Sequence, residues 1–181
     1  MRRSIQVFAA VALVAGLVLA AGVSLAGDHS YVGVDGCKMC HKKEATGDQY
    51  NKWLNGPHAK AFEALKSEAA AKAVADAGLT GNAWELDECL SCHVTGHGVD
   101  AAMLGKKYKV EDGVGCESCH GPGSEYKSAK VMKDHDAAVA AGLAVITAET
   151  CTACHNEKSP TFKGFDFAEY SKQIAHPDPS K

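Results

Sequence analysis

Aromatic side chains are scarce in this chain of 181 residues, at 7% of the sequence, and proline occurs only five times. No long polar or low-complexity linker is present, and no stretch alternates between apolar and polar residues as a strand does, so a single mainly helical domain is expected. Positive charge is not in excess either, because 19 lysines and arginines face 22 carboxylates. That balance argues against nucleic acid as a partner and favours a basic or neutral protein partner.

No cysteine lies outside one repeated motif. All eight cysteines fall in four C-x-x-C-H pentads, at residues 37–41, 89–93, 116–120 and 151–155, so none is left for a disulfide. Two thiols at this spacing can form thioether bonds to the vinyl groups on one edge of a porphyrin, and the adjoining histidine becomes the proximal iron ligand. Four covalently bound haem c groups are therefore predicted. The predicted attachment residues are Cys37, Cys40, Cys89, Cys92, Cys116, Cys119, Cys151 and Cys154. The predicted proximal ligands are His41, His93, His120 and His155.

Zinc is the alternative for paired C-x-x-C motifs, because eight cysteines would serve two four-cysteine sites. Zinc does not need a histidine after each pair. The chain has nine histidines, and each of the four pairs is followed directly by one of them. This regularity favours haem over zinc.

The N-terminus predicts export. Arg2 and Arg3 precede an apolar run, and residues 24–26 form a small-x-small cleavage site, so residues 1–26 are interpreted as a signal peptide and residues 27–181 as one tetrahaem domain. A periplasmic location is expected. An extracellular location, or an uncleaved N-terminal membrane anchor, is the alternative. The segment contains no cysteine, which excludes a lipoprotein signal.

The expected fold consists of short helices and loops wrapped around four closely packed haems. Cleavage leaves roughly 39 residues per haem, too few for a separate core around each one. The clearest helix is expected over residues 57–78, which begin with proline and end with glycine, and a second over residues 124–142. Two shorter helices are expected with Asp166 and Thr147 as N-caps, the second carrying the fourth pentad.

Five histidines remain as candidates for four distal iron positions: His29, His58, His97, His135 and His176. His58 and His135 lie in apolar rows at helical spacing, which suits a face turned toward haem. His97 follows His93 too closely to reach the same ring, so it would serve a different haem.

Methionine is the competing distal ligand. Met39 lies inside a pentad and is sterically unsuitable, while Met103 and Met132 are interpreted as packing residues. Bis-histidine ligation and low potentials are therefore expected.

Three stretches around the pentads resemble the tetrahaem cytochrome c-554 family in content and order. They are residues 56–62 (GPHAKAF), residues 92–96 (CHVTG) and residues 115–123 (GCESCHGPG). The likeness runs from about residue 35 to residue 155. The pentads alone are common to many cytochromes, so these flanking residues are the specific part.

The resemblance implies an exported electron carrier with mostly bis-histidine haems in stacked pairs, although some members keep one haem five-coordinate. It also implies that His58 is a distal ligand, of the third haem. Two departures affect the pairing. Only 22 residues separate His93 from Cys116, fewer than expected of the family, and Tyr126 stands where related sequences often have a histidine, so His135 is the candidate for that position.

Three functions are weighed. The first is a diffusible electron carrier in anaerobic, nitrogen or metal respiration, in which electrons hop through stacked haems between partners such as quinol-linked proteins or other cytochromes. The second is a haem enzyme whose one five-coordinate iron acts on nitrogen oxides. The third is a subunit of a cytochrome filament or respiratory complex, which leaves an oligomer open. The five spare histidines favour the carrier, because they can fill all four distal positions.

Overall fold

The computed structural model of the chain describes residues 29–177, and the expected signal peptide lies outside them. Within this range the α-helices are α1 (Val34–His41), α2 (Gln49–Leu54), α3 (Ala61–Ala64), α4 (Glu68–Asp76), α5 (Asp87–His93), α6 (Cys116–His120), α7 (Ala129–Met132), α8 (His135–Ala140), α9 (Ala148–Thr152) and α10 (Phe167–Ile174). Single 3₁₀ turns lie between them: η1 (Glu44–Thr46), η2 (His58–Lys60), η3 (Ala83–Glu85), η4 (Ala101–Met103) and η5 (Val110–Asp112). The β-structure in these residues is one isolated bridge between Tyr31 and Leu104. The prediction of a mainly helical fold of short helices and loops is confirmed.

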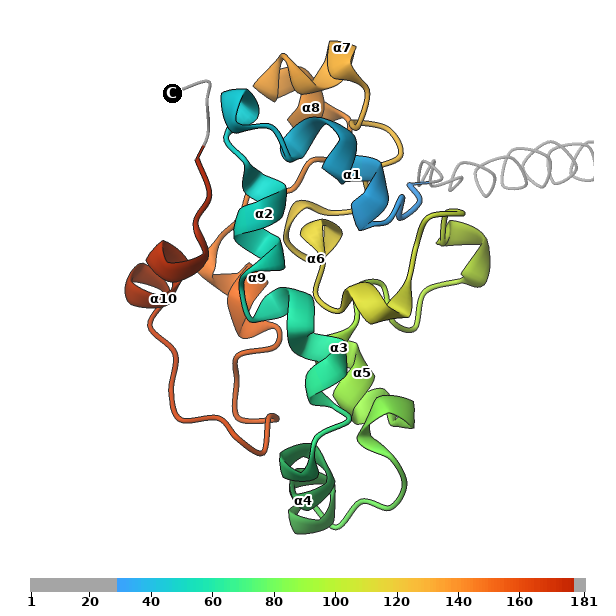
Figure 1. Cartoon of the computed structure of the whole chain (residues 1–181), viewed down its shortest axis with the longest axis vertical. Coiled ribbons are helices and arrows are strands. Elements are labelled where there is room, and N and C mark those ends of the chain that lie inside the picture. The colour runs from blue at the N-terminus through green and yellow to red at the C-terminus, as the bar shows by residue number, and fades with distance from the viewer. Residues whose placement is uncertain (1–28, 178–181) are drawn as a thin grey trace, which may run out of the picture.

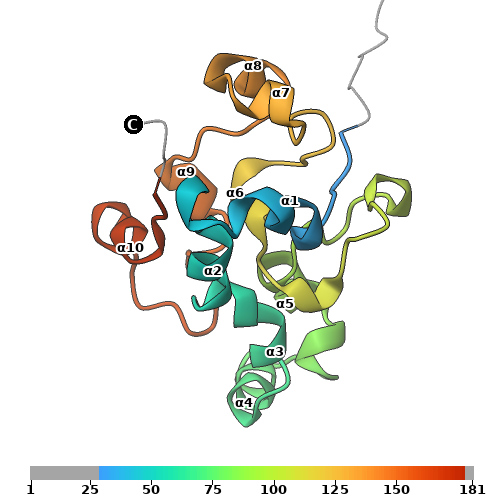
Figure 2. The same ribbon diagram turned by 45° about the horizontal axis from the view of Figure 1, so that its top comes forward.

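The helices are arranged around α6. Figures 1 and 2 show α6 near the middle, α4 at one end of the molecule, and α7 and α8 at the other. Helices α9 and α10 lie along one side in Figure 1. No helix within residues 29–177 combines the length and the hydropathy needed to span a membrane.

The prediction of a single helix over residues 57–78 is wrong. The backbone forms η2, α3 and α4 instead, with a break before α4. Ser67 causes the break, because its hydroxyl accepts a hydrogen bond from Ala70 N (3.2 Å) and donates one to Ala64 O (2.7 Å), which starts a new helix. The expected stop is confirmed at Gly78, whose φ of +69° lies in the left-handed region.

The helix expected over residues 124–142 is also divided. It begins after Ser128 rather than Ser124, and it forms the two short helices α7 and α8. Asp134 separates them, because its carboxylate accepts a hydrogen bond from Ala137 N (3.0 Å) and caps α8. The helical apolar row anticipated there is therefore interrupted.

Both of the shorter predicted helices are confirmed with their caps. Asp166 accepts a hydrogen bond from Glu169 N (3.0 Å) at the start of α10. Thr147 and Thr150 form a reciprocal capping box at the start of α9. These caps fix where the last two helices begin, and α9 carries the start of the fourth pentad.

The apolar core of the described residues is small and lies beside the second pentad. Its buried members are Phe62, Leu65, Val74, Ala83 and Val94. They come from α3, α4, η3 and the residue after α5, and Cys89 and Leu90 of α5 pack against them. This cluster holds the α4 end of the molecule to the helix that carries the second pentad.

Candidate haem-attachment site

Each pentad lies on a short helix or at its end. The first pentad occupies the second half of α1, the second most of α5, and the third all of α6. The fourth starts with Cys151 in α9 and ends in the following turn with Cys154 and His155. A helical turn brings two cysteines three residues apart to one face, which is the arrangement that two vinyl groups of one porphyrin require. None of the eight cysteines, all within the described residues, forms a disulfide.

Two proximal histidines are oriented by hydrogen bonds to their Nδ1 atoms. His93 Nδ1 lies 2.7 Å from Ala61 O, and His41 Nδ1 lies 3.2 Å from Gln49 Oε1. Both oxygens can only accept, so each Nδ1 carries the proton and each Nε2 is left with a free lone pair. Metal-binding histidines are held in this way by their neighbours, so the arrangement fits iron ligation. The sequence alone did not point to Ala61 or Gln49.

The fourth pentad faces the distal candidate His58. The ring centres of His58 and His155 are 6.1 Å apart at an angle of 64°. Two imidazoles on opposite sides of one metal, each bound at about 2 Å, have ring centres about 6 Å apart. Burial, and then the neighbouring His155, lower the pKa of His58, so it stays neutral and able to bind a metal.

The third pentad faces His176. The ring centres of His120 and His176 are 5.8 Å apart at an angle of 37°. Burial lowers the pKa of His120 to about 4, with smaller contributions from His176 and His41. The influence of His41 also shows that the first pentad lies close to the third.

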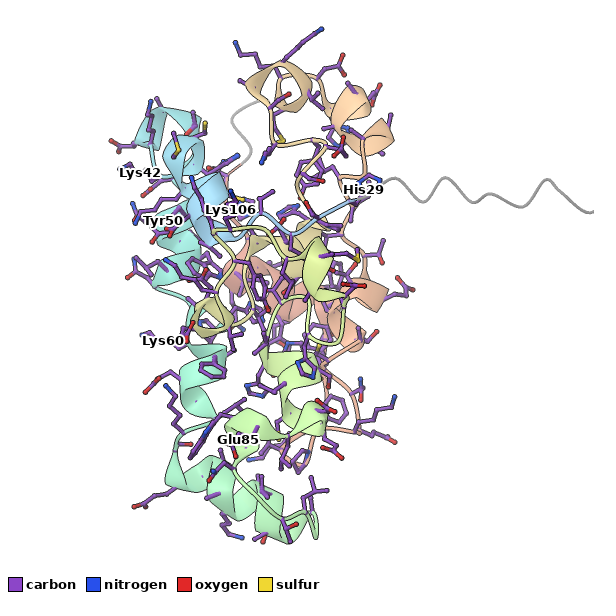
Figure 3. All side chains as sticks on the ribbon, turned by 90° about the vertical axis from the view of Figure 1, so that its right-hand side faces the viewer. His29, Lys42, Tyr50, Lys60, Glu85 and Lys106 are labelled. Carbon is purple, nitrogen blue, oxygen red and sulfur yellow. The ribbon has the colours of Figure 1, made fainter. Side chains whose placement is uncertain are left out.

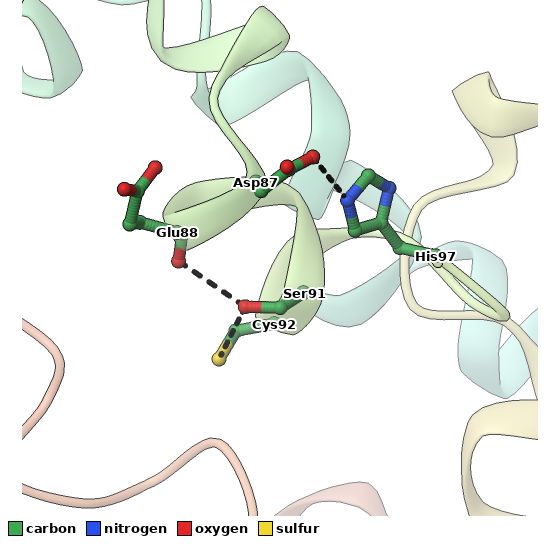
Figure 4. Close-up of polar contacts among 5 residues, drawn as sticks. All are labelled: Asp87, Glu88, Ser91, Cys92 and His97. Atoms are coloured by element: carbon green, nitrogen blue, oxygen red, sulfur yellow. Dashed lines mark hydrogen bonds and ion pairs between the residues drawn. The ribbon is translucent and has the colours of Figure 1, made fainter. Parts of the chain in front are cut away.

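His97 pairs with a carboxylate and not with a proximal histidine. Its Nε2 lies 2.9 Å from Asp87 Oδ1, at the start of α5 (Figure 4). The carboxylate is 90% exposed, whereas the imidazole is only 24% exposed. In this structure the atom of His97 that would bind iron therefore pairs with Asp87.

The last two candidates lie toward the α7 and α8 end. The His29 ring lies against Gly142, with Cε1 2.9 Å from where a Cβ of that glycine would stand, and its Nδ1 is buried without a hydrogen-bond partner. Figure 3 labels His29 at the start of the described chain. His135 is the first residue of α8, and its side chain is 69% exposed beside Asp136. Neither ring faces a proximal histidine as His58 and His176 do.

Thiols from different pentads are neighbours. The Cys116 thiol, together with burial, raises the pKa of Cys37, so the first and third pentads meet. Burial, and then the Cys92 thiol, raise the pKa of Cys154 to about 12, so the second and fourth pentads meet. These interactions link residues that are 79 and 62 positions apart in the sequence.

A weaker electrostatic interaction links these two pairs. Burial raises the pKa of Cys119, and the Cys151 thiol adds to the effect, so the third pentad lies in the neighbourhood of the fourth. These interactions link the four pentads in the order first, third, fourth, second. The first and second pentads, at the ends of this order, lie on α1 and α5.

The residues present fit haem c. Each pentad supplies two reduced thiols and an imidazole on one short segment, and two of the four imidazoles face a second imidazole at the spacing of a bis-histidine iron. A zinc ribbon instead requires four protein ligands around one ion. Across residues 29–177, no three histidine, cysteine, aspartate or glutamate side chains gather into such a group.

Comparison with known proteins gives one family and one relative. The family model for cytochrome c554 and c-prime matches residues 36–121. A protein of Nitrosomonas europaea, cytochrome c-554, is 35% identical over 164 residues, which cover 81% of this chain and 66% of that protein. No solved structure matches the chain.

Proposed function

This chain belongs to the cytochrome c-554 family, and on that premise we propose that it is a tetrahaem electron carrier. The observation that carries the proposal is the gathering of four haem-attachment pentads in one small fold, with thiols of different pentads near enough to shift one another's pKa and two of the pentad histidines facing a second imidazole. Electrons can pass among several redox groups in one protein when neighbouring groups lie close together.

The chain's own residues bind and orient four haems. When bound, each haem supplies an iron that exchanges one electron between ferric and ferrous states. The paired thiols of each pentad would hold one haem on a short helix, and the adjoining imidazole would bind its iron. Ala61 O and Gln49 Oε1 fix the rings of His93 and His41 so that Nε2 is presented to the metal. No proton donor or substrate pocket is needed for outer-sphere transfer.

The distal ligands follow from the ring geometry. We assign His58 to the fourth iron, opposite His155, and His176 to the third iron, opposite His120. This differs from the third-haem role that family resemblance implied for His58. The third iron is instead assigned to His176, a residue after α10 that lies near His120 only in the folded chain.

His29 and His135 are the candidates for distal ligands of the first and second irons. His29 Nδ1 is buried without a partner, and the segment containing it leads directly into α1, which supports a role at the first haem. We assign no iron to His97, because its Nε2 is paired with Asp87.

Export and partner follow from the sequence. We propose that residues 1–26 direct the chain to the periplasm and are removed, and that residues 27–181 form one domain. The partners are redox proteins, and the excess of carboxylates over lysines favours a basic or neutral docking face on them.

The direct test is to produce the full chain in a host that attaches haem c and to measure mass, haem spectrum and electron exchange. We expect a mass increase of four haems, reversible reduction, and transfer of electrons to a second c-type cytochrome. The paired change Cys151→Ser and Cys154→Ser is the control, and it should remove one haem. A product with fewer than four haems contradicts the tetrahaem proposal. Turnover of nitric oxide or hydroxylamine, without transfer to protein partners, would instead establish the enzyme alternative.

A further inference from the structure

Glu117, the second residue of the third pentad, carries a buried charge. The residue is 4% exposed. Its Oε1 accepts hydrogen bonds from Val32 N (2.8 Å) and Gly123 N (2.7 Å), and its Oε2 accepts one from Gly33 N (2.9 Å). Both oxygens act as acceptors, which is how an ionised carboxylate is satisfied. Among the described residues, no lysine, arginine or histidine forms an ion pair with it.

These bonds join two segments that are far apart in the sequence. Ser30 and Ser124 add a reciprocal pair, in which Ser30 N donates to Ser124 Oγ (2.9 Å) and Ser124 N donates to Ser30 O (3.1 Å). We call residues 30–33 and 117–124, held in this way, the Glu117 clasp. Gly123 is needed for its closure, since a Cβ there would stand 3.1 Å from Glu117 Oε1.

The clasp sits between two haem-attachment helices. Its first segment ends at the N-cap of α1, which carries the first pentad, and its second segment includes α6, which is the third pentad. Helices α1 and α6 pack against each other beside it, and the Cys116 thiol raises the pKa of Cys37. Anything that loosens the clasp therefore changes how the first and third pentads are spaced.

We propose that Glu117 is a positioning and redox-tuning residue for the first and third haems, which it locks together through the clasp and holds at low potential through its buried negative charge. The inference rests on the proposed electron-carrier function. Oxidised iron carries one more positive charge than reduced iron, so a nearby negative charge stabilises the oxidised form. Because Glu117 is buried, water and salt screen its charge less than that of a surface carboxylate.

The test is Glu117→Gln in the haem-loaded full chain, with Glu125→Gln as its matched control. Glu125 lies just beyond Gly123 in the same turn, but it is exposed to solvent. Both changes remove one negative charge. We expect Glu117→Gln to raise the ratio of reduced to oxidised haem at a fixed ambient potential by about tenfold in one or two of the four haems, equivalent to about 59 mV. Glu125→Gln should leave all four potentials as they were.

A second variant separates charge from shape. Glu117→Asp keeps the charge but shortens the side chain, so it should lower the melting temperature while the potentials stay close to those of the unaltered protein. Equal potential shifts in Glu117→Gln and Glu117→Asp would overturn the tuning role. So would Glu117→Gln potentials identical to those of Glu125→Gln, with four haems attached and reversibly reduced.

The unaltered protein provides the test if Glu117→Gln loses haem. In that case the individual potentials must place at least one of the first and third haems below both the second and the fourth, and any other order overturns the proposal. Failure of the electron-carrier function would look different, because the unaltered protein itself would then lack four reversibly reduced haems.

Discussion

Replacing His58 with alanine is expected to leave the fourth iron five-coordinate without unfolding the protein. The backbone at this position is held independently of the side chain, because His58 O accepts a hydrogen bond from Val114 N (3.1 Å). The half-buried ring faces His155 at 6.1 Å between centres. Removing it takes away one of the two imidazoles of that iron and none of the attachment residues.

The size of the effect follows from the count of pentads. One haem in four should change from low-spin to high-spin, so about a quarter of the low-spin signal in the electron paramagnetic resonance spectrum should be lost. Mass spectrometry should still show four attached haems. His58→Met should restore the low-spin state, with a higher potential at that haem, since a methionine axial ligand raises the potential.

The matched control is His97→Ala. It also removes a histidine side chain, but His97 pairs with Asp87, so its loss should leave the spectrum unchanged. The assignment to the fourth iron is checked in the Cys151→Ser, Cys154→Ser background, where His58→Ala should add no high-spin signal. Wholly low-spin spectra for His58→Ala, or a new high-spin haem in that background, would refute the geometric reasoning.

Three further outcomes are expected. His176→Ala should make the third haem high-spin, and its effect should add to that of His58→Ala; a double variant with only one high-spin haem would contradict the two separate pairs. In the haem-free chain, where His120 binds no iron, burial, followed by its histidine neighbours, lowers the pKa of His120 from 6.5 to about 4, so folding keeps it neutral where the unfolded chain takes up a proton. The contribution of His120 to the free energy of unfolding of the haem-free chain should therefore be level above about pH 6.5 and fall by up to about 1.4 kcal/mol per pH unit toward pH 4, as guanidinium titrations would show; a rise over that range would be evidence against it. Trp53→Phe removes the Nε1–H that donates to Val114 O (2.8 Å), and calorimetry should show a loss of about 1–2 kcal/mol with four haems still attached, whereas unchanged stability would mean that this bond contributes nothing.

Local signals in the sequence were sufficient for part of the fold. Asp166 and Thr147 cap the helices expected of them, because a cap depends on side chains within three residues. The two longer predicted helices failed for the same reason. Ser67 and Asp134 stand inside otherwise helical patterns, and their side chains bond the backbone more favourably as caps than as helix interior.

The covalent part of the proposed site can be read from the sequence, and its spatial part cannot. The eight attachment cysteines and four proximal histidines are predicted from spacing alone, and that assignment stays a prediction. The facing of His58 to His155, or of His120 to His176, depends on how distant segments pack, and no local pattern encodes it. In the sequence, Glu117 is one residue of the family-like stretch 115–123, and no local pattern predicts its buried hydrogen bonds. Its donors Val32 and Gly33 lie more than 80 positions earlier.

The contacts between pentads also restrict how the protein can be made. In a chain that folded before loading, Cys37 would stand beside Cys116, and Cys92 beside Cys154. An oxidant could join each pair as a disulfide, and these two bonds would remove one attachment cysteine from every one of the four pentads. Maturation therefore requires one of two conditions: thioether formation precedes closure of the compact fold, or a reductant keeps the thiols reduced until the thioethers have formed.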